Sequence, residues 1–209
     1  NFTGLEILRG GSRNNTFIIG GEQQYDLYGG DGNDSFVFLD GGRLTGDGNG
    51  RWGNLDGGSG NNTLDFSAYT SPREILLTAP GNAGGFNGRE ESIAGEFRNI
   101  TGLTGSQASD SLTGLNRANI WEIRGTNGGT YRSGDSSLSF ISLGTLHGGA
   151  LNDRFQIFDG ASFEGHLDGG GGSNTLDYSG ISEGIEVDLS TGEASMIVGT
   201  VSAIQNVTG

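Results

Sequence analysis

Short apolar stretches recur along the chain at a spacing of 8 to 11 residues. Many of them place a second apolar side chain two residues after the first, as in Phe36 and Phe38, which puts both on one face of a β-strand. Turns rich in Gly and Asn separate them. The pattern predicts short strands and tight turns, two of each in a coil of roughly 18 to 20 residues, and no helix. The spacing is seen at Phe17, Leu27, Phe36, Leu44, Leu55 and Leu64.

A nine-residue frame organises these turns. Its most complete example is Gly-Gly-Asp-Gly-Asn-Asp-Ser-Phe-Val at residues 29–37, which has a polar sixth and an apolar eighth position. Five further stretches keep this frame, and they begin at Gly10, Gly57, Gly105, Gly148 and Gly169. The sixth position is a carboxylate at Asp34, Asp110 and Asp153 and an amide at Asn15, Asn62 and Asn174.

Longer phrases also recur, which predicts unequal copies of one unit. We expect an incomplete first copy over residues 1–98, a complete copy over residues 99–205 and the start of a third at residues 206–209, all in one continuous solenoid. Because neither terminal stretch has the pattern of a polar cap, we expect this chain to be a window in a longer array. The matched phrases are 2–19 with 140–157, 55–67 with 167–179, and 99–102 with 206–209.

Several segments outside the frame have patterns of their own. Residues 75–77 and 185–189 are predicted as further strands, and residues 81–92, with their Gly, Asn and charged residues, as an excursion loop. Residues 119–131 predict a strand, a Gly-rich turn and the start of another strand. Trp121 in this segment is interpreted as core packing, with a sugar-stacking platform as the alternative.

Composition narrows the class of protein. The 43 glycines keep the period of the apolar residues, which is typical of a turn-rich all-β chain. With 25 Asp plus Glu against 11 Lys plus Arg, the net charge is −14, and without a basic stripe we expect no nucleic-acid partner. We also expect no membrane span, because no stretch approaches the roughly 18 apolar residues that it needs. The lack of cysteine is compatible with an extracellular bacterial protein, and we expect any targeting segment to lie outside this chain.

The Asp-containing turns are candidate calcium sites. Calcium takes six to eight oxygen ligands, and glycine turns expose backbone carbonyls beside a carboxylate. The alternative is that Asp and Asn occupy these positions because they suit turn geometry. For Asn15, Asn62 and Asn174 we favour a ladder of stacked amides. The candidate ligands are Asp34 with Asp31 and Asn15, Asp153 with Asn174 and Asp168, and Asp110.

A carbohydrate-binding or carbohydrate-active β-helix is the alternative function. Such enzymes use clustered carboxylates on one face, and Asp65 and Asp177 could line one. These two positions repeat with the structural unit, whereas an active site is usually unique, so we predict no enzyme. His147 and His166 are expected in surface turns. The chain has only these two histidines and no cysteine, which excludes zinc and thiol chemistry.

Residues 29–37 resemble the nonapeptide of RTX, or hemolysin-type calcium-binding, repeats. The phrases at residues 174–179, 185–192 and 204–209 are similar to tandem repeats of very large secreted bacterial proteins, adhesin-like or filamentous-haemagglutinin-like. The resemblance implies a right-handed, elongated parallel β-solenoid, or β-roll, that is exported to the cell surface or beyond. It also implies a stalk or surface-contact role, with neighbouring repeats and host or matrix glycans or proteins as partners.

Carried over to single residues, the resemblance implies calcium at Asp34 and, less completely, at Asp110 and Asp153. Two features depart from a regular RTX array. Three of the six turns carry Asn at the sixth position, and the step from Gly29 to Gly57 is irregular for an array with a nine-residue period.

Overall fold

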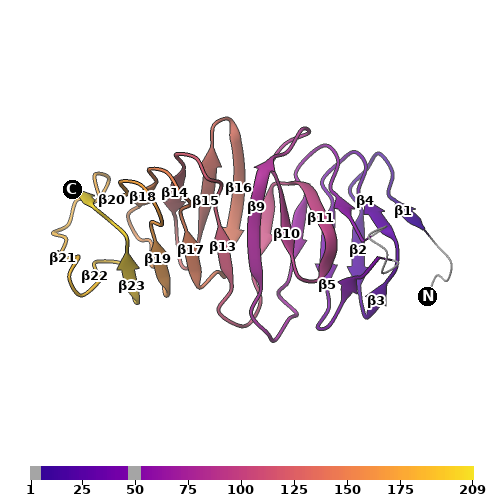
Figure 1. Ribbon diagram of the computed structural model, residues 1–209, viewed down its shortest axis with the longest axis horizontal. Coiled ribbons are helices and arrows are strands. Elements are labelled where there is room, and N and C mark those ends of the chain that lie inside the picture. The colour runs from indigo at the N-terminus through magenta and orange to yellow at the C-terminus, as the bar shows by residue number, and fades with distance from the viewer. Residues whose placement is uncertain (1–5, 47–52) are drawn as a thin grey trace.

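The computed structural model describes residues 6–46 and 53–209, and these residues form β-strands and turns without a helix. Figure 1 shows the strands side by side along the long axis of an elongated molecule. The all-β class is therefore confirmed. Phe2 and Leu5, which belong to the first repeated phrase, lie outside the described residues. Within the described ranges, nothing forms a helix that could cross a membrane.

Two long sheets run the length of the molecule, and the chain passes back and forth between them. Sheet A has 12 strands and sheet B has 10. Along its main path sheet A contains β1 (Ile7–Arg9), β4 (Asp26–Tyr28), β7 (Leu55–Asp56), β11 (Ile93–Ile100), β10 (Phe86–Glu90), β9 (Glu74–Pro80), β13 (Ser111–Thr113), β17 (Thr145–His147), β19 (His166–Asp168) and β23 (Thr200–Ser202), with β3 (Glu22–Gln23) and β6 (Arg43–Leu44) beside it. Sheet B contains β2 (Thr16–Ile19), β5 (Ser35–Phe38), β8 (Thr63–Asp65), β12 (Gly102–Thr104), β16 (Ser136–Ile141), β15 (Gly128–Ser133), β14 (Ile120–Ile123), β18 (Arg154–Ile157), β20 (Thr175–Asp177) and β24 (Asn206–Thr208).

Most neighbouring strands are parallel and in register. Thr16 of β2 pairs with Ser35 of β5, so at this point the chain returns to sheet B after a single coil of the predicted length. The next return, from Ser35 to Thr63, is longer, because residues 45–54 separate β6 from β7, whereas only residues 24–25 separate β3 from β4. Chain that alternates between two parallel sheets in this way is compatible with the predicted β-solenoid.

Each sheet also contains an antiparallel insertion, so both sheets are mixed. In sheet A, β10 pairs antiparallel with β9 and with β11, and in sheet B β15 does the same with β14 and β16. The loop predicted over residues 81–92 is therefore wrong, since this segment contains β10. Phe86 is fully buried, and Glu90 is buried with Arg73 and Ser92 as hydrogen-bond partners. The segment was predicted as a loop because it is rich in Gly, Asn and charged residues, yet it contains an interior strand.

The core lies between the inward faces of the two sheets, where equivalent side chains stack from strand to strand. Phe17 stacks on Phe36 with ring centroids 5.3 Å apart, and Trp121 stacks on Phe155 at 5.8 Å. Trp121 is 0 % exposed, which confirms its interpretation as core packing. The strand, turn and strand predicted over residues 119–131 are confirmed by β14 and β15. Within the described ranges, the largest fully buried side chains of this core are the aromatic ones of Trp121, Tyr131 and Tyr178.

A third, two-stranded sheet lies at the C-terminal end of the molecule in Figure 1. It consists of β21 (Val187–Asp188) and β22 (Glu193–Ala194), which pair antiparallel. The strand predicted over residues 185–189 is present in its middle part. The strand predicted over residues 75–77 lies within β9.

Parallel pairing relates the two predicted copies to each other. β8 of the first copy pairs with β12 of the second, so that Thr63 faces Gly102. β20 of the second copy pairs with β24 at the start of the third, and Thr175 faces Asn206. Gly102 and Asn206 are therefore structural equivalents, although the sequence match aligns Asn206 with Asn99 instead. That phrase match is out of structural register, and the copy boundaries stay a prediction.

Candidate functional site

Polar side chains of the nine-residue frame line the corner at which the chain enters sheet B. Five of the six sixth-position residues of the frame stand immediately before a strand of that sheet, and Asp110 is the exception. Asn119 has the same position before β14, although no frame predicted it. We call the following set the corner ladder: Asn15, Asp34, Asn62, Asn119, Asp153 and Asn174.

Within the corner ladder, a side-chain oxygen accepts a hydrogen bond from the backbone N–H of its neighbour. The N–H of Asn15 donates to Oδ1 of Asp34 at 2.7 Å, and the N–H of Asp34 donates to Oδ1 of Asn62 at 3.0 Å. The ladder thus satisfies buried backbone donors that have no strand partner at the corner. These bonds are compatible with the ladder predicted for Asn15, Asn62 and Asn174, but carboxylates alternate with the amides in it. In the C-terminal half the same bonds run from Asn119 to Asp153 at 2.9 Å and from Asp153 to Asn174 at 2.8 Å.

Asn and Asp members of the ladder differ in the second terminal atom of the side chain, which is Nδ2 in Asn and Oδ2 in Asp. Nδ2 of Asn174 donates to the carbonyl oxygen of Ala203 at 2.9 Å. At Asp34 and Asp153 the corresponding atom is Oδ2, which is buried and has no hydrogen-bond partner. A buried polar atom without a partner is costly, because it has lost its hydration and gained nothing in return. Within the ladder, Oδ2 of these two Asp residues is therefore unsatisfied, as is Oδ1 of Asn119.

The first glycine of the frame lies directly against this terminal atom. A Cβ added to Gly29 would lie closer than 3.0 Å to Oδ2 of Asp34 and to the carbonyl oxygen of Gly57. Only glycine fits such a position, and the reason is contact with the neighbouring strand, which sequence reasoning did not reveal. The same cradle recurs at Gly148, between Oδ2 of Asp153 and the oxygen of Gly169, and at Gly105, beside Oδ2 of Asp110.

The electrostatics at Asp153 follow from its burial. Burial raises the pKa of Asp153 to about 6, although hydrogen bonds from the side chain and the backbone N–H of Asn119 oppose this rise. On β15, burial raises the pKa of the Tyr131 phenol to about 12, and the charge of Asp153 contributes to this rise. Asp153 is thus a carboxyl group that the fold favours in its neutral form.

These corners offer carboxylate and carbonyl oxygens, which are the kinds of ligand that calcium binds. Oδ2 of Asp34 with the carbonyl oxygen of Gly57, or Oδ2 of Asp153 with that of Gly169, would hold it. The ion would supply the positive charge that each buried carboxylate lacks. Across residues 6–46 and 53–209, His, Asp and Glu side chains form no group of three or more that could hold a metal ion. Calcium would therefore take most of its six to eight ligands from carbonyl oxygens and water.

The remaining candidate ligands lie away from the corner ladder. Asp31 is exposed and accepts a hydrogen bond from Oγ of Ser59 at 2.6 Å. Asp110 precedes β13 of sheet A, at a different corner, and accepts from the N–H of Arg73 at 2.6 Å. Asp168 lies within β19, and its side chain contacts His147 and not Asp153.

Asp168 instead contacts a histidine on the neighbouring strand. Its Oδ2 lies 3.2 Å from Nδ1 of His147. Burial by itself would raise the pKa of Asp168, but hydrogen bonds from the N–H of Gly170 and from His147 outweigh burial and lower it. His147 and His166 lie in β17 and β19, so their placement in turns was wrong. Both are half-buried residues that alternate with inward-facing Leu146 and Leu167.

Asp65 and Asp177 end the equivalent strands β8 and β20. Each accepts a hydrogen bond from the N–H two residues later, at 2.9 Å in both cases. The Asp177 side chain is fully covered and paired with Arg154, whose Nε donates to it at 2.7 Å. The copies have thus diverged at this position, because Asp65 is only partly buried.

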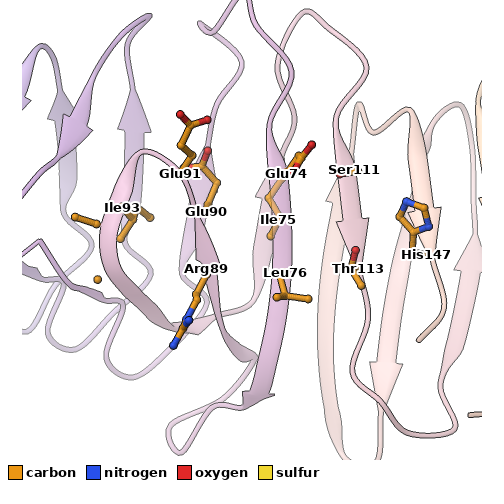
Figure 2. A pocket seen from close by; sticks show the side chains of 12 residues that line it. Glu74, Ile75, Leu76, Arg89, Glu90, Glu91, Ile93, Ser111, Thr113 and His147 are labelled. Atoms are coloured by element: carbon orange, nitrogen blue, oxygen red, sulfur yellow. The ribbon is translucent and has the colours of Figure 1, made fainter. Parts of the chain in front are cut away.

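An open groove of about 790 Å³ lies on the outer face of sheet A. In Figure 2, Glu74 and Glu91 lie near one end, with Arg89 and Leu76 further along and His147 to one side. Arg89 pairs with Glu96 at 3.2 Å, and Glu90 beneath the rim is held by Arg73 at 3.0 Å. The groove therefore follows from the antiparallel insertion, and much of its charge is already paired.

Comparison with protein-family models and with curated proteins gives no match for this chain.

Proposed function

We propose that this chain is a structural segment of a large secreted or cell-surface bacterial protein, built as a right-handed parallel β-solenoid. In this role the coils hold one another in line and set a distance between whatever lies at the two ends of the segment. Contacts with host or matrix glycans or proteins are part of the proposal through the resemblance to adhesin-like repeats.

One observation carries the proposal. The polar residues that the frame repeats are used to join one strand to the next, as in the hydrogen bonds from Asn15 to Asp34 and from Asp34 to Asn62. Side chains that satisfy backbone donors along the axis contribute to a stack in which each repeat supports its neighbours. The alternative of glycan stacking on Trp121 has no support, since this side chain is fully buried.

Calcium is a local part of this proposal. The unpartnered Oδ2 atoms of Asp34 and Asp153, each beside a glycine carbonyl, support it. In this view the ion neutralises a buried carboxylate and tightens two adjacent turns, and it takes no part in a reaction.

The experiment is to remove one coil in register. Arg154 pairs with Thr175, so deletion of residues 154–174 joins Asp153 to Thr175 and leaves the inward and outward faces unchanged. The shortened chain is expected to melt cooperatively and to be shorter by about 4.8 Å, the spacing of adjacent strands, in solution X-ray scattering.

The matched control is deletion of residues 154–173, which differs by a single residue. This change is expected to turn every following side chain of β20 to the opposite face and to abolish the cooperative transition. If both deletions unfold the chain equally, the coils do not act as exchangeable structural units and the proposal fails.

A further inference from the structure

β21 and β22 occupy the place in the second copy that β9 and β10 occupy in the first. The hydrogen bond from the N–H of Tyr69 to the oxygen of Phe66 recurs in the second copy, from Ile181 to Tyr178, at 2.8 Å in both cases. The next strand in each copy begins an antiparallel hairpin. The offset that aligns residues 55–67 with 167–179 also aligns Glu74 with Glu186. The two hairpins are therefore structural equivalents.

The strands that follow the hairpins extend this correspondence. β11 pairs parallel with β7, with Arg98 opposite Asp56. β23 pairs parallel with β19 in the same way, with Ser202 opposite Asp168. In both copies the strand after the hairpin thus returns to sheet A, although β10 pairs with β11 there, whereas β21 and β22 form a separate two-stranded sheet.

The two copies differ at the far edge of the hairpin. In the first copy β9 pairs parallel with β13 of the second copy, so that Leu112 lies opposite Ile75. Within the described part of the chain, β21 pairs with β22 alone. The backbone of Glu186 accepts a hydrogen bond from the N–H of Ser195 at 2.9 Å on the β22 side. Residues 185 and 187 therefore direct their N–H and C=O groups to the opposite, open edge.

Side-chain exposure reveals the same difference. Ile75 and Leu77 of β9 are 2 % and 3 % exposed. Their equivalents at the same offset are Val187, which is half-buried, and Leu189, which is 43 % exposed. An alternating apolar face on an unpaired strand edge is the usual template for the addition of another strand.

We propose that the open edge of β21 accepts a further parallel strand with the chemistry of β13, supplied by another copy of the repeat. Such a strand carries a polar, an apolar and a polar residue after an aspartate, as Asp110, Ser111, Leu112 and Thr113 do. This proposal rests on the proposed structural role, and it identifies another copy of the repeat as the binding partner of the β21 edge.

The β9–β13 contact gives the register of the incoming strand. Ser111 lies opposite Glu74, so its counterpart lies opposite Glu186. Oδ1 of Asp110 accepts from the N–H of Arg73 at 2.6 Å, and the N–H of Ser111 donates to the oxygen of Arg73 at 2.9 Å. In the complex, the backbone of Ile185 takes the place of Arg73 and makes both of these hydrogen bonds.

The test uses the whole chain and a peptide of residues 105–115. Because the chain has no cysteine, Glu186→Cys provides a single thiol on the outward face of the edge. Two peptides carry Ser111→Cys or Thr113→Cys, and disulfide formation is measured under mild oxidation. In the proposed register, residue 111 of the peptide lies opposite residue 186 at about 4.8 Å, which is within the reach of a disulfide. Residue 113 lies two positions further along the strand and is out of reach. We therefore expect about tenfold more disulfide product with the Ser111→Cys peptide than with the Thr113→Cys peptide.

A second pair of variants tests the apolar contact. Val187→Asp on the edge is expected to reduce cross-linking about tenfold, whereas Val198→Asp, at a residue that is 69 % exposed outside the edge, is expected to leave it unchanged. Thermal melting of all variants shows whether they fold.

Equal product with both peptides, or a preference for the Thr113→Cys peptide, which an antiparallel strand would produce, overturns the proposal. No product above that of a scrambled peptide does the same. If the in-register deletion of residues 154–174 behaves as expected while this test fails, the structural role stands and only the docking edge is rejected.

Discussion

Asn119 donates two hydrogen bonds to a single oxygen of Asp153. Its backbone N–H lies 2.9 Å and its side-chain Nδ2 2.7 Å from Oδ1 of Asp153, while Oδ2 of the same carboxyl group is buried without a partner. In this corner an amide would satisfy both terminal positions, as Asn174 does one strand further on. The aspartate therefore carries a cost that depends on its protonation.

That cost predicts a pH-dependent stability. The pKa of Asp153 is raised from 3.8 to about 6 in the folded state. Below pH 4 the carboxyl group is protonated in both the folded and the unfolded state, and its full favourable contribution to stability is present. This contribution is lost as the pH rises through 6. The shift corresponds to a contribution of about 3 kcal/mol to the free energy of unfolding. Urea unfolding at pH 4, 6 and 8 measures it.

Asp153→Asn isolates this residue from other titrating groups. The variant is expected to be more stable than the parent chain at pH 8 and to have a flatter pH profile, because its amide can donate to the facing carbonyl oxygen. Asp31→Asn, on an exposed carboxylate, is the matched control and is expected to leave the profile unchanged. Parallel pH profiles for the parent chain and Asp153→Asn would contradict the prediction.

Gly29→Ala tests the close approach between neighbouring turns. The new Cβ would clash with the backbone oxygen of Gly57, which cannot move without displacing the next strand. We expect a loss of about 1–3 kcal/mol in the free energy of unfolding, as for other overpacked sites. Gly11→Ala is the control, because its Cβ meets no atom within 4 Å. Similar unfolding midpoints for the two variants would show that the cradle can relax.

Trp121 gives a prediction for the core. Trp121→Ala is expected to cost about 3–5 kcal/mol, because it removes a fully buried ring that stacks on Phe155. Trp121→Phe is expected to cost less, since a ring remains and the buried indole N–H that it removes has no partner. Chemical denaturation measures the free energy of unfolding of both variants. A larger loss for Trp121→Phe than for Trp121→Ala would argue that the indole N–H has a bonding role.

Calcium is predicted to raise the melting temperature of chelator-treated protein when it is added at about millimolar concentration, since a ligand that binds only the folded state stabilises it. The double variant Asp34→Asn and Asp153→Asn is expected to lose this shift, because Nδ2 would replace the free carboxylate oxygen in each cradle. Magnesium, which demands a smaller octahedral site, is the control ion. An unchanged melting temperature of the parent chain in calcium would end the calcium hypothesis.

Sequence reasoning was most reliable where a local period carries the information. Leu64 and Phe66 lie two residues apart in a β-strand pattern, and both are fully buried at or next to β8. The spacing of 19 residues between Asn15 and Asp34 predicted adjacent turns, and the two side chains are hydrogen-bonded. These relationships follow from short-range alternation and from the length of one coil, so they can be read from residue order.

The candidate site was only partly predictable. Asn119 belongs to the corner ladder, although no Gly-rich frame precedes it. The only sequence feature that could have indicated this role is an Asn directly before a strand pattern. Asp168 was grouped with Asp153 because it precedes the turn of Asn174, yet it belongs to β19 and contacts His147. Proximity in sequence did not indicate which face of a strand a side chain occupies.

Residue order alone was enough to predict an all-β chain, repeating turns, and Asn or Asp at equivalent corners, because each property depends on residues within one or two coils. The packed fold was needed to reveal that β10 and β15 run antiparallel inside the sheets and that Gly29 must lack a side chain. It was also needed to reveal that Oδ2 of Asp34 and Asp153 faces an acceptor. These properties depend on which strand lies beside which, and such pairings join residues far apart in the chain, beyond the reach of any local pattern.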